Sequence, residues 1–139
     1  HGEVQELSQD EVLPIMVVET GGSLRVVIMF YLPENELSKV MDKHMRLLAK
    51  KHMGTKFCKV NAEKVPFFVD KLNIRTIPSL VSFKDGKAVH KQLGCLGLGV
   101  DADGNANSSD EFPTWRLARV ISEYGDAIEE IIETDDEYE

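Results

Sequence analysis

The sequence predicts an α/β fold with a central mixed β-sheet flanked by helices on both faces. Two observations lead to this prediction. β-type and helical segments alternate along the 139 residues in the order β-α-β-α-β-α-β-β-α, and a strong hairpin signal, Asp85-Gly86, comes late in the chain. The length suffices for one domain with a substantial buried core.

The first elements are a short strand and a helix. Val4–Leu7 carries a strand pattern, and Ser8 with Glu11 three residues later forms a capping box at the start of a helix over about Gln9–Glu19. Pro14 falls inside this helix, beyond the positions where proline is tolerated. We therefore expect a kink there or a shorter helix.

The central feature is the stretch Leu24–Met53, which reads as strand, turn and helix. A continuous run of β-branched and aromatic residues, Arg25–Tyr31, predicts a buried strand. A polar turn follows, and then a long helix over about Asn35–His52. Its apolar residues recur at helical spacing: Leu37, Met41, Met45 and Leu48. In open α/β sheets, ligands and catalytic residues usually lie at the turns that follow the carboxyl ends of central strands.

Further strands and a helix complete the expected sheet. They are a strand over Lys56–Asn61, a short helical segment over Val65–Leu72, and two strands, Ser79–Lys84 and Lys87–Leu93, joined by Asp85-Gly86. Both turn positions tolerate the positive φ that a two-residue hairpin needs.

The composition after the hairpin shifts to Gly, Asp, Asn and Ser, so residues 94–112 are expected to form a flexible inserted loop. Pro113 suits a first helical turn and opens a C-terminal helical segment over residues 113–132, which Gly125 would break in two. Its apolar residues are Leu117, Ile121, Tyr124, Ile128 and Ile131. We predict a single domain over residues 1–132, followed by an acidic tail over residues 133–139.

The charge is distributed unevenly along the chain. Residues 1–99 carry 14 basic and 11 acidic side chains, a net +3, whereas residues 100–139 carry 2 basic and 13 acidic side chains, a net −11; together they give the chain's net −8. An acidic C-terminal third argues against nucleic acid as a partner, because nucleic-acid binding needs clustered Lys and Arg.

Other features bear on the cellular setting. No apolar run reaches membrane-spanning length and no secretory signal pattern opens the chain, so no membrane partner is expected. The chain begins at His1 instead of Met, and we expect the natural N-terminus to lie upstream. Two cysteines, far apart and without metal or redox spacing, indicate a reducing compartment and a cytoplasmic location.

Four signatures resemble the thioredoxin family. In chain order they are the strand Val26–Tyr31 before the turn and long helix, Lys59-Val60-Asn61, the loop Asn73–Ser79 around Pro78, and the hairpin Phe83–Lys87 with the later Gly94. The resemblance covers residues 4–95 and implies a thioredoxin-like fold. It also implies that Pro78 is the family's cis-proline, and X–Pro is the one place where a cis peptide bond is readily accommodated.

The departure from the family is as informative as the match. Thioredoxins carry Cys-x-x-Cys at the start of the long helix, where this chain has Asn35-Glu36-Leu37-Ser38. The family's chemistry requires a thiolate that attacks a disulfide, and asparagine and serine cannot supply one. A buried acid of the family's central strand is replaced by Met29. We therefore predict that the chain is not an enzyme and needs no cofactor.

Within the superfamily, further segments resemble the phosducin-like branch, nearest to the thioredoxin-domain-containing protein nine type. They are His1-Gly2-Glu3, Met41–His44, Lys50–His52, Thr55–Phe57, Glu63–Phe67 and Trp115–Leu117. This resemblance implies a co-chaperone that binds the cytosolic ring chaperonin and modulates the folding of actin, tubulin and related clients. Some relatives bind G-protein βγ subunits. Others keep one cysteine of the pair, where this chain has Ser38.

The degenerate redox positions have two interpretations. Asn35 and Ser38 form either a modified polar site or helix caps that remain after redox chemistry was lost. We favour the interpretation as helix caps. Pro78 serves either as a fixed backbone turn or as part of an inherited peptide groove.

The cysteines and histidines are each assigned a structural or a functional role. Cys58 lies in a strand pattern and is expected to be buried, whereas Cys95 follows Gly94 and is a candidate reactive thiol. His44 and His52 are expected to be core or capping residues, because no further metal ligands stand at consistent spacing. The loop from Asp101 to Asp110 has the composition of a calcium loop but neither its first carboxylate nor its closing Glu, so no metal is expected.

One helix face is basic. Lys39, Lys43, Arg46 and Lys50 follow one another at spacings of four, three and four and form a stripe on the predicted helix Asn35–His52. Such a stripe is either a solvated face or a docking surface for an acidic partner.

The leading hypothesis is a non-catalytic thioredoxin-fold adaptor that acts in chaperonin-assisted folding. The alternative is a single-thiol redox or peroxide sensor that uses Cys95, and a third reading is a structural subunit of a larger assembly.

Overall fold

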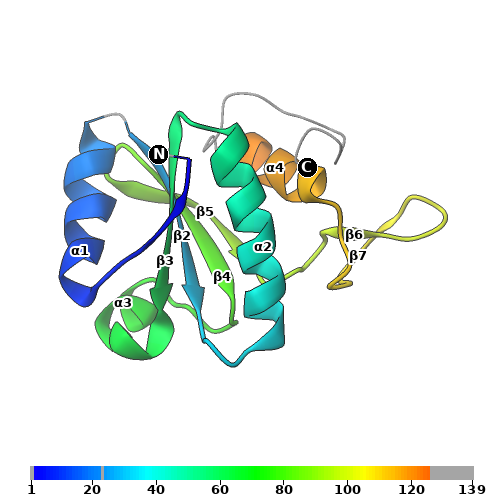
Figure 1. The fold of residues 1–139 in the computed structure, drawn as a ribbon, viewed down its shortest axis with the longest axis horizontal. Helices are drawn as coiled ribbons and strands as arrows, with labels where there is room; N and C mark the ends of the chain where they lie inside the picture. The colour runs from blue at the N-terminus through cyan, green and yellow to red at the C-terminus, as the bar shows by residue number, and fades with distance from the viewer. Residues whose placement is uncertain (1, 23, 126–139) are drawn as a thin grey trace.

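A five-stranded mixed sheet forms the centre of the protein (Figure 1). The computed structural model describes residues 2–22 and 24–125. The strands are β1 (Val4–Glu6), β2 (Arg25–Tyr31), β3 (Thr55–Asn61), β4 (Ser79–Lys84) and β5 (Lys87–Leu93), arranged in the order β1-β3-β2-β4-β5. The α/β class predicted from the alternation of segments is confirmed.

The sheet combines two kinds of pairing. β3 pairs in parallel with both β1 and β2, because helical crossovers separate these strands along the chain. β4 runs antiparallel to both β2 and β5, and the β4–β5 turn places Asp85 at φ 54° and Gly86 at φ 76°. This turn is the two-residue hairpin that Asp-Gly predicts.

Helices cover both faces of the sheet. α1 (Gln9–Leu13), η1 (Pro14–Glu19) and α3 (Pro66–Lys71) lie on one face, and α2 (Glu36–Lys51) and α4 (Thr114–Gly125) lie on the other (Figure 1). A short 3₁₀ turn, η2 (Ala62–Lys64), links β3 to α3.

The central strand β2 divides the core into two clusters. Val27 and Met29 face α2 and α4, whereas Val26, Ile28 and Phe30 face α1, η1 and α3. Side chains of a strand alternate between the faces of its sheet, and both faces here are covered, so the run is apolar throughout. All five side chains are fully buried.

The first helical region is interrupted at Pro14, as expected. The α-helix α1 ends at Leu13 and is therefore shorter than the range to Glu19, and the π-helical segment η1 occupies Pro14–Glu19. Proline lacks the N–H that would continue the α-helical hydrogen bonding. The capping interaction is present: Glu11 Oε1 accepts from the Ser8 backbone N–H at 2.9 Å, and this bond lowers the pKa of Glu11.

The segment predicted as a flexible loop has structure of its own. Two short strands, β6 (Gly99–Val100) and β7 (Ala106–Asn107), pair antiparallel, and Leu98 is fully buried in the cluster beneath α2 and α4. The Asp101 carboxylate accepts two backbone N–H groups, from Asp103 and Asn105, and so closes the hairpin tip.

The last described helix, α4, begins at Thr114, one residue after Pro113, as predicted. Its Leu117 and Ile121 are buried against the sheet. The predicted helical positions Ile128 and Ile131 and the acidic tail lie outside the described residues. Among residues 2–22 and 24–125, no helix has the length and apolar character required to span a bilayer.

Candidate functional site

The turn after β2 lies where thioredoxin-like chains carry their redox motif, and here its polar side chains cap a helix. Asn35 is the N-cap of α2, and its Oδ1 accepts from the Ser38 backbone N–H at 2.8 Å. The Ser38 side chain is only 2% exposed, and its Oγ accepts from the Leu32 N–H at 3.3 Å. Asn35 therefore caps the first turn of α2, whereas the Ser38 hydroxyl binds the backbone of the turn that precedes the helix.

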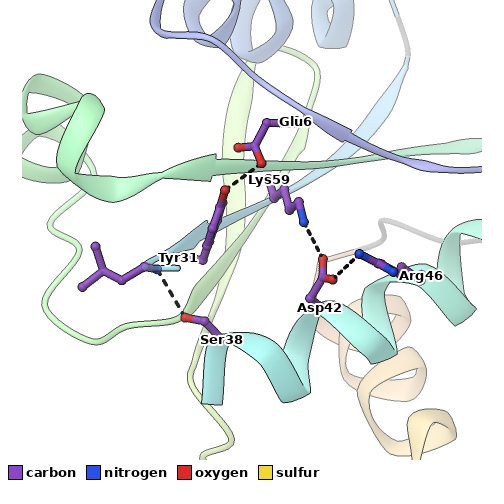
Figure 2. A network of polar contacts seen from close by, with 7 residues as sticks. Glu6, Tyr31, Ser38, Asp42, Arg46 and Lys59 are labelled. Carbon is purple, nitrogen blue, oxygen red and sulfur yellow. Dashed lines mark hydrogen bonds and ion pairs between the residues drawn. The ribbon is translucent and has the colours of Figure 1, made fainter. Parts of the chain in front are cut away.

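A polar network lies directly behind this turn (Figure 2). Met29 is the register partner of Lys59 on β3 and is fully buried. The Lys59 ammonium meets the Asp42 carboxylate of α2 at 3.0 Å. The other Asp42 oxygen pairs with Arg46 at 3.0 Å. Asp42 thus joins α2 to β3 and holds two cations.

Tyr31 completes the network. Its hydroxyl donates to Glu6 on β1 at 2.6 Å, and the Lys59 ammonium lies 5.4 Å from the centre of its ring (Figure 2). Burial, followed by the Glu6 carboxylate, raises the pKa of Tyr31. A pocket of about 180 Å³ borders the network and is lined by Tyr31, Ser38, Asp42 and Lys59, among others. These groups bind one another and include no nucleophilic thiol.

The proline loop reaches the same end of the sheet. The Ile77–Pro78 peptide bond is cis, and the Pro78 carbonyl accepts from the Gly94 N–H at 2.8 Å. Gly94 has φ 52°, and a Cβ at this position would lie 3.3 Å from Leu37 Cδ2 at the start of α2. The structure therefore brings together the proline loop, the end of β5 and the first turn of α2.

The two cysteines lie on opposite sides of the sheet, and both are free thiols. Cys58 is buried in the cluster beneath α1 and α3, and this burial raises the pKa of its thiol to about 12. Cys95 packs against the other cluster, is partly exposed, and its thiol donates to the Ser108 carbonyl at 3.2 Å. Because the sheet separates them, the two residues do not form a dithiol pair.

The histidines occupy structural positions. His44 is buried, its ring stacks on Phe112 with centroids 4.2 Å apart, and Nδ1 lies 2.7 Å from the Thr114 hydroxyl. His52 is buried at the C-cap of α2. Within the described ranges, no group of three or more His, Cys, Asp or Glu side chains is arranged to hold a metal ion.

The basic residues Lys39, Lys43, Arg46 and Lys50 form a stripe on α2, hereafter the α2 stripe, which is partly neutralised by acids of its own helix. Lys39 pairs with Glu36 at 3.1 Å and Arg46 with Asp42 at 3.0 Å. Lys43 and Lys50 are both exposed, and no ion pair joins either of them to an acid in the described part of the chain. The stripe therefore presents two unneutralised cations, seven residues apart.

The Asp42–Lys59 contact was missed in the sequence. Its helical half was visible, because Asp42 and Arg46 stand four residues apart, the spacing of an ion pair on a helix. Lys59 lies 17 residues from Asp42 and on another element. No local pattern links the two positions.

Comparison with known proteins agrees with this geometry. The thioredoxin family model matches residues 16–99. Phosducin-like protein 3 of Dictyostelium discoideum is 40% identical over 125 residues, which cover 90% of this chain and 61% of that protein. Thioredoxin domain-containing protein 9 of Caenorhabditis elegans is 46% identical over 123 residues, which cover 86% of this chain and 54% of that protein. The chain thus spans about half to three fifths of these relatives.

Solved structures give the same fold. Thioredoxin f2, crystallised with ferredoxin:thioredoxin reductase, matches with a TM-score of 0.61 and 29% identity, over 67% of this chain and 84% of that chain. A thioredoxin of Halobacterium salinarum matches with a TM-score of 0.65 at 19% identity, over 89% of this chain and 92% of that chain, and supports the fold alone. The chain therefore belongs to the thioredoxin family, and its sequence similarity within that family is to phosducin-like proteins.

Proposed function

We propose that this chain is a non-catalytic adaptor, a co-chaperone that binds the cytosolic ring chaperonin and modulates the folding of cytoskeletal or G-protein-related clients. The observation that carries the proposal is the occupation of the two redox positions by Asn35 and Ser38. Asn35 Oδ1 caps α2, and the Ser38 hydroxyl accepts from the Leu32 N–H of the preceding turn. A dithiol reaction needs a thiolate at the start of this helix, and neither residue forms one.

The similarity to phosducin-like proteins supports the same proposal. A chain that keeps the fold but lacks the reacting groups acts through its surface, by complementarity of shape and charge. We assign the partner-binding role to the α2 stripe, with Lys43 and Lys50 as the cations available to an acidic partner. G-protein βγ subunits are a further candidate partner, and the cytoplasm is the proposed location.

A capture experiment tests the proposal. The full-length protein, immobilised and incubated with cytosol at low salt, is expected to retain subunits of the ring chaperonin. A redox-active thioredoxin, immobilised in parallel, serves as the control for binding to the fold alone. Absence of chaperonin subunits, or equal retention by both proteins, would count against the co-chaperone role.

The alternative function is a single-thiol sensor. It is favoured by one observation: Cys95 is partly exposed and follows Gly94, whose N–H bonds to Pro78 at the end of the sheet where the family's chemistry takes place. An insulin-reduction assay that compares the unaltered chain with Cys95→Ser separates the two functions. Turnover that is lost in Cys95→Ser would favour the sensor over the adaptor.

A further inference from the structure

The last fourteen residues hold all of the chain's excess negative charge. Eight of the 24 acidic side chains and none of the 16 basic ones fall in residues 126–139, so residues 1–125 carry 16 of each sign and no net charge. Five of the eight acids lie in the acidic tail predicted over residues 133–139. Charge of one sign is therefore concentrated in one segment, directly after α4.

The helix α2 carries a surplus of the opposite sign. Its 16 residues include five basic and two acidic side chains, a net +3. Acids of the same helix compensate Lys39 and Arg46, whereas Lys43 and Lys50 are exposed and form no ion pair with an acid of residues 2–22 and 24–125. The uncompensated charge therefore lies at two positions of the α2 stripe.

A hollow of about 350 Å³ extends this positive surface from α2 toward β1. Arg46, Lys50 and Lys59 line it together with one carboxylate, that of Glu3. Arg46 and Lys59 share the Asp42 carboxylate, each at 3.0 Å (Figure 2). Among the described residues, three cations thus face two carboxylates, and the hollow can accept a further acidic side chain beside Lys50.

The acidic segment is long enough to reach this surface. α4 packs beside α2 on one face of the sheet, and Ile121 of α4 belongs to the cluster that contains Met45 and Leu48 of α2 (Figure 1). Fourteen extended residues span up to about 45 Å, whereas a helix of 16 residues such as α2 is about 24 Å long. The whole α2 stripe therefore lies within reach of a segment that begins after Gly125.

We propose that residues 126–139 dock on the α2 stripe of their own chain and compete there with an acidic partner. Their carboxylates are complementary to Lys43 and Lys50. A single solvated ion pair contributes little. Tethering, however, holds the segment at an effective concentration on the order of millimolar, so weak contacts suffice to occupy the surface. The docking is a property of the isolated chain, and only the competition rests on the proposed function.

Zero-length cross-linking of the full chain tests the docking. A carbodiimide joins a carboxylate to an amine that it contacts. In dilute protein at low salt, we expect cross-links from residues 126–139 to Lys43 or Lys50, identified by mass spectrometry of the monomer fraction. Lys64 and Lys71, which are exposed on the other side of the sheet, should be linked to this segment at least about fivefold less. High salt should suppress the links to Lys43 and Lys50.

Binding of a second acidic segment tests the competition. The probe is a dye-labelled glutamate peptide, titrated with the full chain at low salt and followed by fluorescence anisotropy. Neutralisation of the tail is expected to tighten binding by about threefold or more. The substitutions are Glu133→Gln, Asp135→Asn, Asp136→Asn, Glu137→Gln and Glu139→Gln.

Matched variants separate this competition from the change in net charge. The gain should disappear when Lys43→Gln and Lys50→Gln are added, because the surface for which tail and peptide compete is then removed. It should persist when Lys64→Gln and Lys71→Gln are added instead, since these change the net charge by the same amount.

Three results would overturn the inference. They are cross-linking of Lys43 and Lys50 at the level of Lys64 and Lys71, equal peptide affinity with and without the tail carboxylates, and a gain that persists in the Lys43/Lys50 variant. Cross-linking uses the unaltered chain, so its result does not depend on the folding of any variant. Neither measurement uses the chaperonin; failure to capture the chaperonin would therefore leave the docking intact, and absence of the cross-links would leave the capture result intact.

Discussion

Individual side chains determine the chemistry of the turn after β2. Met29, the register partner of Lys59, is apolar, and Asp42 of α2 supplies the counter-charge of Lys59 from another element. Asn35 accepts one of the N–H groups that the first turn of a helix leaves without partners, that of Ser38, and the Ser38 hydroxyl ties the helix start to the preceding turn through the Leu32 N–H. The backbone geometry of the family is thus retained while its reactive groups are not.

The two thiols are expected to react at very different rates. Alkylation requires the thiolate and access to it, and burial of Cys58 both hides the sulfur and raises its pKa to about 12. Iodoacetamide at mildly alkaline pH, followed by mass spectrometry, should label partly exposed Cys95 first and Cys58 only after unfolding in urea.

Simultaneous labelling of both cysteines in the folded protein would contradict this burial. Slow labelling of Cys95 at neutral pH would exclude its role as a sensor. Cys95→Ser, in which only Cys58 remains, provides the control for assigning the label.

At the level of elements, Asp42 connects α2 to β3 across the turn. Its side chain is 18% exposed and holds Lys59, which is 19% exposed (Figure 2). In contrast, Glu36 is 86% exposed and pairs with Lys39 of its own helix. Exposed ion pairs contribute little, but removal of one partner from a sheltered pair leaves a charge without compensation.

Asp42→Asn is therefore expected to lower the free energy of unfolding by about 1 to 2 kcal/mol. The matched variant Glu36→Gln should cost less than about 0.5 kcal/mol, because its ion pair is solvated. Urea unfolding followed by circular dichroism measures both. Equal losses would show that the Asp42 bridge between α2 and β3 contributes no more than a surface pair.

A second connection between elements depends on Gly94. This residue has φ 52° and lies close to Leu37 of α2, whereas Gly97, at φ 73°, has no atom within 4 Å of the position that a Cβ would take. Alanine at Gly97 should cost about 1 kcal/mol for the left-handed backbone alone. Alanine at Gly94 should cost about 2 kcal/mol or more, since it adds a contact of 3.3 Å with Leu37 Cδ2.

Thermal unfolding of the two alanine variants isolates the contribution of the Gly94–Leu37 contact. Leu37→Ala in the Gly94→Ala background should recover part of the loss if this contact is its cause. An equal cost at Gly94 and Gly97 would show that the close approach of the β5 end to α2 contributes nothing.

On the scale of the whole molecule, charge is distributed unevenly along the chain, with a net +3 over residues 1–99 and a net −11 over residues 100–139. The α2 stripe keeps two cations without acidic partners among the described residues, and the chain as a whole carries a net −8. Complementary charge chiefly affects the rate and the salt dependence of association, so these are the quantities that report on the stripe.

Lys43→Glu with Lys50→Glu is expected to weaken capture of the partner by about tenfold at low salt and to reduce its salt dependence. The control is Lys64→Glu with Lys71→Glu, which reverses the same charge on the other side of the sheet. Capture across a salt series measures the effect, and unchanged binding by the Lys43/Lys50 variant would remove the stripe from the proposed mechanism.

Much of the fold was predictable because its signals are local. β2, β4 and β5 have the bounds that their apolar and turn patterns predict, and α2 differs from its predicted range by one residue at each end. The loop after β5 was predicted less well. Its Gly, Asp and Ser content indicates a loop, but the burial of Leu98 beneath α2 and α4 depends on packing that composition does not record.

The sequence by itself determined the succession of strands and helices, the buried character of β2 and the loss of dithiol chemistry. Each of these depends on residue types within a short window. Only the tertiary structure decided that Lys59 meets Asp42, that His44 meets Thr114 across 70 residues, and that Arg116 and Arg119 line the same hollow as His90. Such contacts join distant positions, and they are set by the packing of elements on the sheet.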